Sequence, residues 1–168
     1  MRLRPHIIEV GNHAKILALL KLMAGGANLS WYDQKVYEVV HRWLLLASQH
    51  LGVASRLVAK PRQWRSTVSR SYYAAYNASR SVRYFVHGQV KLTGEDHQSV
   101  GELPDDFPNR ATWSSFLTDL RKDRNIADYE PWPEARQTLS LPPRDSYLKA
   151  RELLTVCRAY LRGKGVVI

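Results

Sequence analysis

The chain places four residues that can bind phosphate or move protons close together: Arg124, Asn125, Asp128 and Tyr129. Their segment has helical periodicity, and at about 100° per residue Arg124 and Asp128 continue an apolar stripe that starts at Trp113. A charge is costly where the pattern calls for leucine, unless it is paired or has a function. Two interpretations are open. Arg124 and Asp128 form an ion pair that pins the helix to a neighbour, or Arg124 faces a cleft or subunit interface and binds an anion such as phosphate.

The other chemistry-bearing residues predict neither a metal site nor a cofactor site. The six histidines are scattered, and none pairs with another at the three- or four-residue spacing of a helical metal site. The sequence has no phosphate-binding glycine loop and no Gly-x-Ser-x-Gly motif. The single cysteine, Cys157, stands on an apolar helical face and is predicted to be a core residue. By elimination, any catalysis is expected to be metal-independent and to use Arg, Asn, Tyr, Asp or Ser side chains.

The charge of the chain is strongly basic and unevenly distributed. The formal net charge is +10. Residues 39–94 contain nine Lys or Arg and no Asp or Glu, whereas residues 95–134 contain ten acidic and four basic residues. A long basic stretch without acids makes a positive surface, which suits RNA or DNA. The alternative is pairing with an acidic partner or with the acidic half of the same chain.

A second basic and aromatic surface is predicted on the segment 64–87. One face of that helix carries Tyr73, Arg80 and Arg83, and alternating aromatic and guanidinium groups can stack on bases and bind phosphates. Arg70 would add positive charge if this helix faces the Arg124 segment. The alternative is a tyrosine-rich contact between helices, with arginines that extend to the surface.

The elements that must position these residues are all predicted to be helices. The periodicity indicates helices over residues 12–23, 31–59, 64–87, 111–128 and 144–161, with a possible short helix over 97–103. Glycines at 25–26 and 88 and prolines at 61, 131 and 133 end these helices. No segment shows the alternation of apolar and polar residues that is typical of a β-strand. The tract from 131 to 143 is expected to be an ordered loop.

The length of 168 residues and the apolar content of 45% indicate one folded domain with a real core. The N-terminus carries Arg2 and Arg4, but the apolar run at residues 16–20 is too short for a signal peptide or a membrane span. The protein is therefore expected to be soluble and cytoplasmic, with no membrane contact.

Two motifs in this order resemble the HEPN superfamily of prokaryotic helical domains. The first is the stretch Ser69-Arg70-Ser71-Tyr72-Tyr73-Ala74, and the second is Arg124-Asn125-Ile126-Ala127-Asp128-Tyr129, some fifty residues later. The resemblance covers roughly residues 40–161. It implies an all-α, up-and-down bundle of four to five main helices over residues 31–162. Residues 1–30 are then an N-terminal extension with one helix, and residues 163–168 a frayed tail.

The resemblance also implies a function and partners. Many members are homodimeric, metal-independent endoribonucleases that act as toxins or in phage defence, often beside an antitoxin such as a minimal nucleotidyltransferase. Their motif is an arginine, a polar residue and a later histidine, and two motifs meet across the dimer interface. Arg124 and Asn125 match its first two positions, Tyr129 stands at the histidine position, and Asp128 would hold Arg124.

Three functions remain open. A histidine moves protons near neutral pH, whereas a tyrosine hydroxyl ionises only near pH 10. The first function is a metal-independent endoribonuclease in which Arg124, Asn125 and Tyr129 act on the RNA backbone. The second is a non-catalytic homodimer that binds RNA, a nucleotide or a cognate antitoxin. The third is a purely structural dimer that pairs with an acidic antitoxin.

Overall fold

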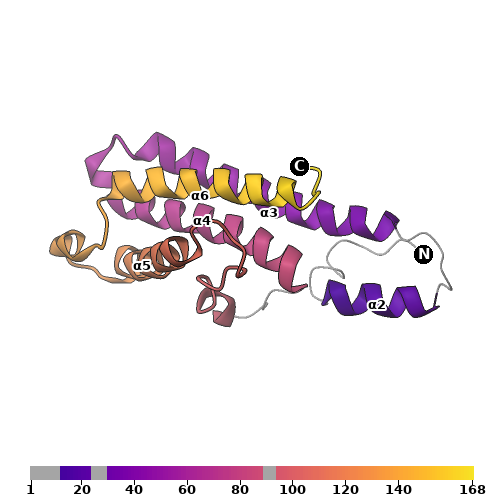
Figure 1. The fold of residues 1–168 in the computed structure, drawn as a ribbon. Coiled ribbons are helices and arrows are strands. Elements are labelled where there is room, and N and C mark those ends of the chain that lie inside the picture. Colours follow the sequence, from indigo (N-terminus) through magenta and orange to yellow (C-terminus); the bar gives the residue numbers. More distant parts are fainter. Residues whose placement is uncertain (1–11, 24–29, 89–93) are drawn as a thin grey trace.

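The structure is a computed structural model that describes residues 12–23, 30–88 and 94–168, and these residues form an all-α bundle without strands (Figure 1). Its five helices pack against each other: α2 (His13–Met23), α3 (Ser30–Leu57), α4 (Trp64–His87), α5 (Arg110–Tyr129) and α6 (Pro143–Gly163). Three short 3-10 helices connect them: η1 (Pro61–Gln63), η2 (Gly94–His97) and η3 (Pro133–Thr138). The predicted all-α class is confirmed.

The helix α4 is the central element, because it packs against α3, α5 and α6. Small side chains on α4, including Ser71, Ala74, Ala75 and Ala78, are fully buried. Small residues at a contact let neighbouring helices approach closely. Larger apolar side chains of all four helices fill the remaining core, and each contributes about 1.5–3 kcal/mol when fully buried. They include Val40, Leu44, Val68, Val82, Leu117, Leu120, Leu153, Cys157 and Leu161.

The helix boundaries agree with the sequence prediction to within two residues, and α4 matches it at both ends. At its C-terminus, Gly88 has a φ of 80°, and its amide donates to the Tyr84 carbonyl. A Cβ at this position would lie 2.7 Å from the Asn12 side-chain oxygen. Glycine is therefore required there for conformation and for space. The glycines at 25–26 lie outside the described residues.

The structure differs from the prediction in two places. The possible short helix over 97–103 does not form: η2 ends at His97 and turns follow it. Val100 and Leu103 are buried and hold this segment against the core. The tail 163–168, expected to fray, returns to the core. Val166 is only 3% exposed, and its amide donates to the Leu161 carbonyl over 3.0 Å. Burial of this valine provides the free energy that holds the tail.

In the parts of the chain that the structure describes, no helix is both long and apolar enough to cross a membrane.

Candidate functional site

Arg124 lies at the edge of the bundle, held between α5 and α4. Its side chain is only 11% exposed. Nη2 donates to the Tyr73 hydroxyl over 3.0 Å, and Nη1 donates to Asn125 Oδ1 over 3.1 Å and to the Tyr129 hydroxyl over 3.3 Å. Three of the four residues in this cluster come from one helical turn and a half of α5. The fourth, Tyr73, is 51 residues away in sequence.

Asp128 provides the counter-charge. Its Oδ2 lies 3.4 Å from Arg124 Nε, which is the predicted i,i+4 ion pair. Nε is buried and forms no hydrogen bond of normal geometry with the described residues, so this contact is mainly electrostatic. The Ser69 hydroxyl lies 3.5 Å from the same carboxylate oxygen and ties it to α4. Arg124 is thus paired with Asp128 and anchored to a neighbouring helix.

Aromatic rings surround the guanidinium group of Arg124. Its Cζ lies 5.3 Å from the ring centre of Tyr72, 5.4 Å from that of Tyr73 and 5.7 Å from that of Tyr129. A cation over such rings gains about 0.5–2 kcal/mol per good contact. Burial opposes the charged form, but the surrounding hydroxyl groups and carboxylate hold the pKa of Arg124 above its ordinary value. The site therefore holds a fixed, permanently charged guanidinium.

Contacts from Arg65 and Asp123 fix the end of α5 that carries this cluster. Arg65 of α4 donates to the carbonyls of Ala127 over 2.9 Å and Trp132 over 3.0 Å. A cation at a helix C-terminus also interacts favourably with the helix dipole. Asp123, which is 1% exposed, accepts the amide of Ser140 over 2.8 Å. Its carboxylate therefore holds the segment after η3 against α5.

The outer side of the site is open and aromatic. Asn125 is exposed, Tyr129 is 71% exposed and Trp132 is 67% exposed. Beside them lies an open groove of about 460 Å³ that is lined by Ile126, Glu130, Trp132, Glu134, Ala135 and Thr138. Exposed aromatic rings next to a cation can stack on nucleic-acid bases.

The sequence analysis missed two histidines that contact the Arg124 cluster through Tyr73. His50 of α3 stacks on the Tyr73 ring at 5.4 Å between centres, and His97 of η2 meets it edge-on at 6.4 Å. Burial and the neighbouring Arg70 lower the pKa of His50. No local pattern indicates these contacts, because each histidine is more than twenty residues from Tyr73.

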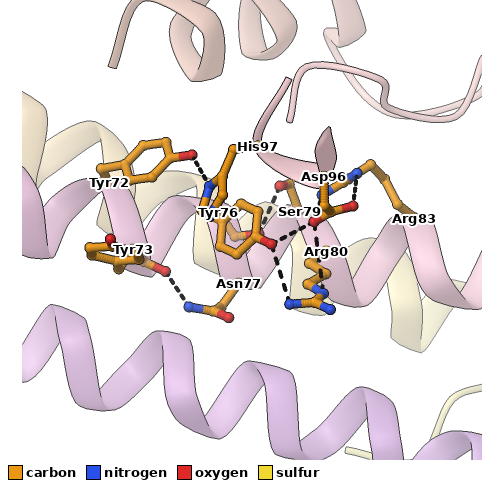
Figure 2. A network of polar contacts seen from close by, with 9 residues as sticks. All are labelled: Tyr72, Tyr73, Tyr76, Asn77, Ser79, Arg80, Arg83, Asp96 and His97. Carbon is orange, nitrogen blue, oxygen red and sulfur yellow. Dashed lines mark hydrogen bonds and ion pairs between the residues drawn. The ribbon is translucent and has the colours of Figure 1, made fainter. Parts of the chain in front are cut away.

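Arg80 and Arg83, predicted to bind nucleic acid, lie instead in a buried network around Asp96 (Figure 2). Arg83 is 5% exposed in its side chain and donates to both Asp96 oxygens, over 3.0 and 3.1 Å. Arg80 lies over the Trp43 ring at 3.8 Å and donates to the Tyr76 hydroxyl over 3.2 Å. This geometry corrects the prediction that Arg83 is on the surface, because its charge is already paired.

Arg70 is exposed and near the site. Its Nη1 lies 3.4 Å from His50 Nδ1, and His50 in turn stacks on Tyr73. The structure therefore brings Tyr73 and Arg70 to the side of the Arg124 cluster, and it places Arg80 and Arg83 elsewhere on α4. Among the described residues, no three His, Cys, Asp or Glu side chains gather as a metal site would require.

The fold and site together define an all-α bundle with a paired arginine at an aromatic edge. Searches against protein-family models, curated proteins and solved structures found no match to this chain.

Proposed function

We propose that this protein binds RNA at the Arg124 site and cleaves its backbone without a metal ion. The observation that carries the proposal is the cluster itself. The Asn125 amide oxygen and the Tyr129 hydroxyl both lie within hydrogen-bond distance of the Arg124 guanidinium, and both residues are exposed. The net charge of +10 favours a polyanionic partner. The two sequence motifs that resemble HEPN proteins support the same function.

The chemistry is attack of a ribose 2′-hydroxyl on the adjacent phosphate. This reaction needs a proton acceptor for the hydroxyl, stabilisation of the phosphorane charge and a proton for the departing 5′ oxygen. Arg124 suits the second task, because its guanidinium is always charged and binds phosphate oxygens in a forked geometry. Charged acceptors form roughly twice as strong a hydrogen bond as neutral ones. A phosphate would therefore displace the Asn125 and Tyr129 oxygens from Nη1.

Asn125 and Tyr129 then have roles of their own. The Asn125 side chain, once released, orients a phosphate oxygen or the 2′-hydroxyl. The Tyr129 hydroxyl donates a hydrogen bond to the departing oxygen. Asp128 keeps Arg124 in position from the opposite side, at 3.4 Å from Nε.

The test is cleavage of a labelled oligoribonucleotide in EDTA, beside the same oligonucleotide with 2′-deoxyribose at every position. We expect products with 2′,3′-cyclic phosphate and 5′-hydroxyl ends from the RNA only. Binding of the deoxy oligonucleotide should weaken steeply as salt is added, because Lys and Arg contacts release counterions from phosphates. An intact RNA across several sequences, or equal cleavage of the deoxy chain, would contradict the proposed reaction.

A second candidate function is a non-catalytic module that binds RNA, a nucleotide or an antitoxin. One observation favours it: Arg124 is paired with Asp128 and donates to the Tyr73 hydroxyl on a neighbouring helix, which is the geometry of a structural anchor. Salt-dependent binding of the oligoribonucleotide without any cleavage would select this function over the first.

We further propose that two copies of the chain pair with their Arg124 sites near one another. The large exposed side chains of Tyr129 and Trp132 beside the site support this, since clustered apolar surface marks interaction sites. Sedimentation equilibrium at micromolar concentration should give twice the chain mass of 19.3 kDa. A single species of monomer mass would exclude the dimer.

A further inference from the structure

The proposed reaction lacks a proton acceptor on α5, where Tyr129 stands at the expected position of a histidine. Two histidines from other elements contact the Arg124 cluster through Tyr73: His50 of α3 and His97 of η2. An imidazole that is neutral near pH 7 is the most common general base in proteins. The contacts of the two rings differ, and these differences decide which one can accept a proton.

The lone pair on Nδ1 of His50 is already used by the neighbouring guanidinium group of Arg70. Arg70 Nη1 lies 3.4 Å from His50 Nδ1, and a guanidinium can only donate. Nδ1 must therefore accept, so that the proton of the neutral ring is on Nε2. Neither nitrogen of His50 has a free lone pair in this arrangement. Gaining a second proton would also place a positive charge directly against Arg70.

His97 has a partner that can either donate or accept. The Tyr72 hydroxyl oxygen lies 2.6 Å from His97 Nδ1 (Figure 2). When Nδ1–H donates to this oxygen, Nε2 keeps a free lone pair. The ring stacks on Tyr76 at 4.4 Å between centres, with an interplanar angle of 22°. It is half-buried, so its orientation is fixed while part of its surface stays open.

The Asp96 network fixes the backbone that carries His97. Asp96 precedes it in η2, is 1% exposed, and accepts hydrogen bonds from Arg83 and from the Tyr76 hydroxyl (Figure 2). A buried ion pair of this kind is weak evidence for stability but can select a single arrangement. Here it holds η2 on α4, which keeps His97 beside Tyr72.

Arg124 and His97 share the same aromatic contacts. Arg124 Cζ lies 5.3 Å from the Tyr72 ring centre, and His97 bonds to the hydroxyl of that ring. Both residues also contact Tyr73, through the bond from Arg124 Nη2 to its hydroxyl and through the edge of its ring. Arg124 and His97 are therefore linked through the same two tyrosine side chains.

We propose that His97 is the catalytic base of the Arg124 site; this assignment rests on the proposed function. His97 Nε2 takes the proton of the 2′-hydroxyl, and the 2′ oxygen forms its bond to phosphorus. The bond from phosphorus to the 5′ oxygen breaks, and that oxygen takes a proton from Tyr129, which regains one from water. His97 then returns its proton to solvent, so no proton or electron is left over.

The charges around His97 favour its neutral form. Burial is the largest effect that lowers the pKa of His97, followed by the positive charge of Arg124. The other charged groups that act on it are Arg121 of α5 and Arg80 of α4, which lower the pKa, and Asp96 of η2, which raises it. The base form thus dominates at neutral pH. Cleavage should rise with pH through a pKa below 6.5 and then level off.

The experiment compares cleavage of one oligoribonucleotide in EDTA by the wild-type protein, Arg124→Gln, His97→Gln and His50→Gln. His50→Gln is the matched control, because it also removes a half-buried histidine that contacts Tyr73. We expect His97→Gln to lower the rate about a hundredfold and to abolish the acid limb of the pH profile. The control should keep that limb. NMR of the wild-type protein should also show the His97 ring signals shift when the uncleavable deoxy oligonucleotide binds.

The outcomes separate this assignment from the proposed function. Two results would overturn the assignment of His97 while the proposed function stands. The first is Arg124-dependent cleavage by His97→Gln that keeps the acid limb of its pH profile. The second is loss of the acid limb in His50→Gln and not in His97→Gln. His97 signals that stay unchanged on binding overturn it even if His97→Gln fails to fold. If the wild-type protein shows no cleavage that depends on Arg124, the proposed function fails and the assignment fails with it.

Discussion

Replacing Arg124 with glutamine is expected to lower RNA cleavage by about two to three orders of magnitude, the usual cost of losing one preorganised charge-stabilising group. The reason is geometric as well as electrostatic. Arg124 is anchored by Tyr73 and Asp128 before any ligand arrives, so its charge needs no reorganisation during the reaction. The measurement is the single-turnover cleavage rate of one oligoribonucleotide at saturating protein concentration, which separates catalysis from binding.

Two further variants make this result specific. Arg124→Lys keeps the charge but loses the forked geometry, and we expect it to recover only a small part of the rate. Lys122→Gln removes an exposed positive charge from the same helix, where Lys122 pairs with nearby Asp119. It should change the rate little. Equal loss in Lys122→Gln and Arg124→Gln would mean that general positive charge, and not the Arg124 site, determines the activity.

Asp96→Asn should lower the free energy of unfolding by about 3–5 kcal/mol, the typical result of breaking a buried ion pair from one side. Arg83 would be left buried and charged, because its side chain is 5% exposed and its hydrogen bonds go to Asp96. Urea unfolding followed by circular dichroism measures the change. The matched control is Asp105→Asn, which breaks a surface pair with Arg110 and should change stability by less than about 1 kcal/mol.

A double variant checks the cause of the Asp96 effect. Replacing both partners, as in Arg83→Met with Asp96→Leu, removes the unpaired charge of Arg83 and should recover part of the lost stability. The recovery is partial because Arg80 also loses its ion pair with Asp96. If the double variant is as unstable as Asp96→Asn, the network acts through packing of η2 and not through charge pairing.

The Asp96 network also makes the free energy of unfolding depend on pH. Burial alone would raise the pKa of Asp96, but the hydrogen bonds and charge of Arg83 outweigh it and lower that pKa overall. Since the folded-state pKa is below the unfolded value of about 3.9, this contribution to stability is complete above that value. It is lost as the pH falls through the folded-state pKa. Acid unfolding should therefore begin below about pH 4, and in Asp96→Asn this component should be missing.

Local sequence signals were sufficient for the helices, because those signals act within a few residues. Gly88 ends α4 in the left-handed conformation, and prolines follow α5 directly, so these boundaries could be read in advance. The apolar stripe that leads to Arg124 also follows from helical periodicity, as does its ion pair with Asp128 four residues later. The residues of the apolar stripe and the two partners of the ion pair all belong to α5.

The helical wheel of α4 was misleading for its arginines. It placed Tyr73, Arg80 and Arg83 on one face, which is correct for the helix, but it could not show what covers that face. Asp96 of η2, thirteen residues later in the sequence, covers the part that carries Arg83. Arg124 covers the part that carries Tyr73, 51 residues away. A charge on a predicted surface is exposed only if no other element brings it a partner.

The sequence by itself determined that this protein is an all-α bundle and that Arg124, Asn125, Asp128 and Tyr129 lie together, because helical spacing decides both. Only the tertiary structure decided that Tyr72 and Tyr73 surround Arg124 and that His97 joins them. Those contacts depend on how α4, α5 and η2 pack, and packing is set by buried side chains far apart in the chain. The arginine was therefore evident from the sequence, but the base proposed to act with it was not.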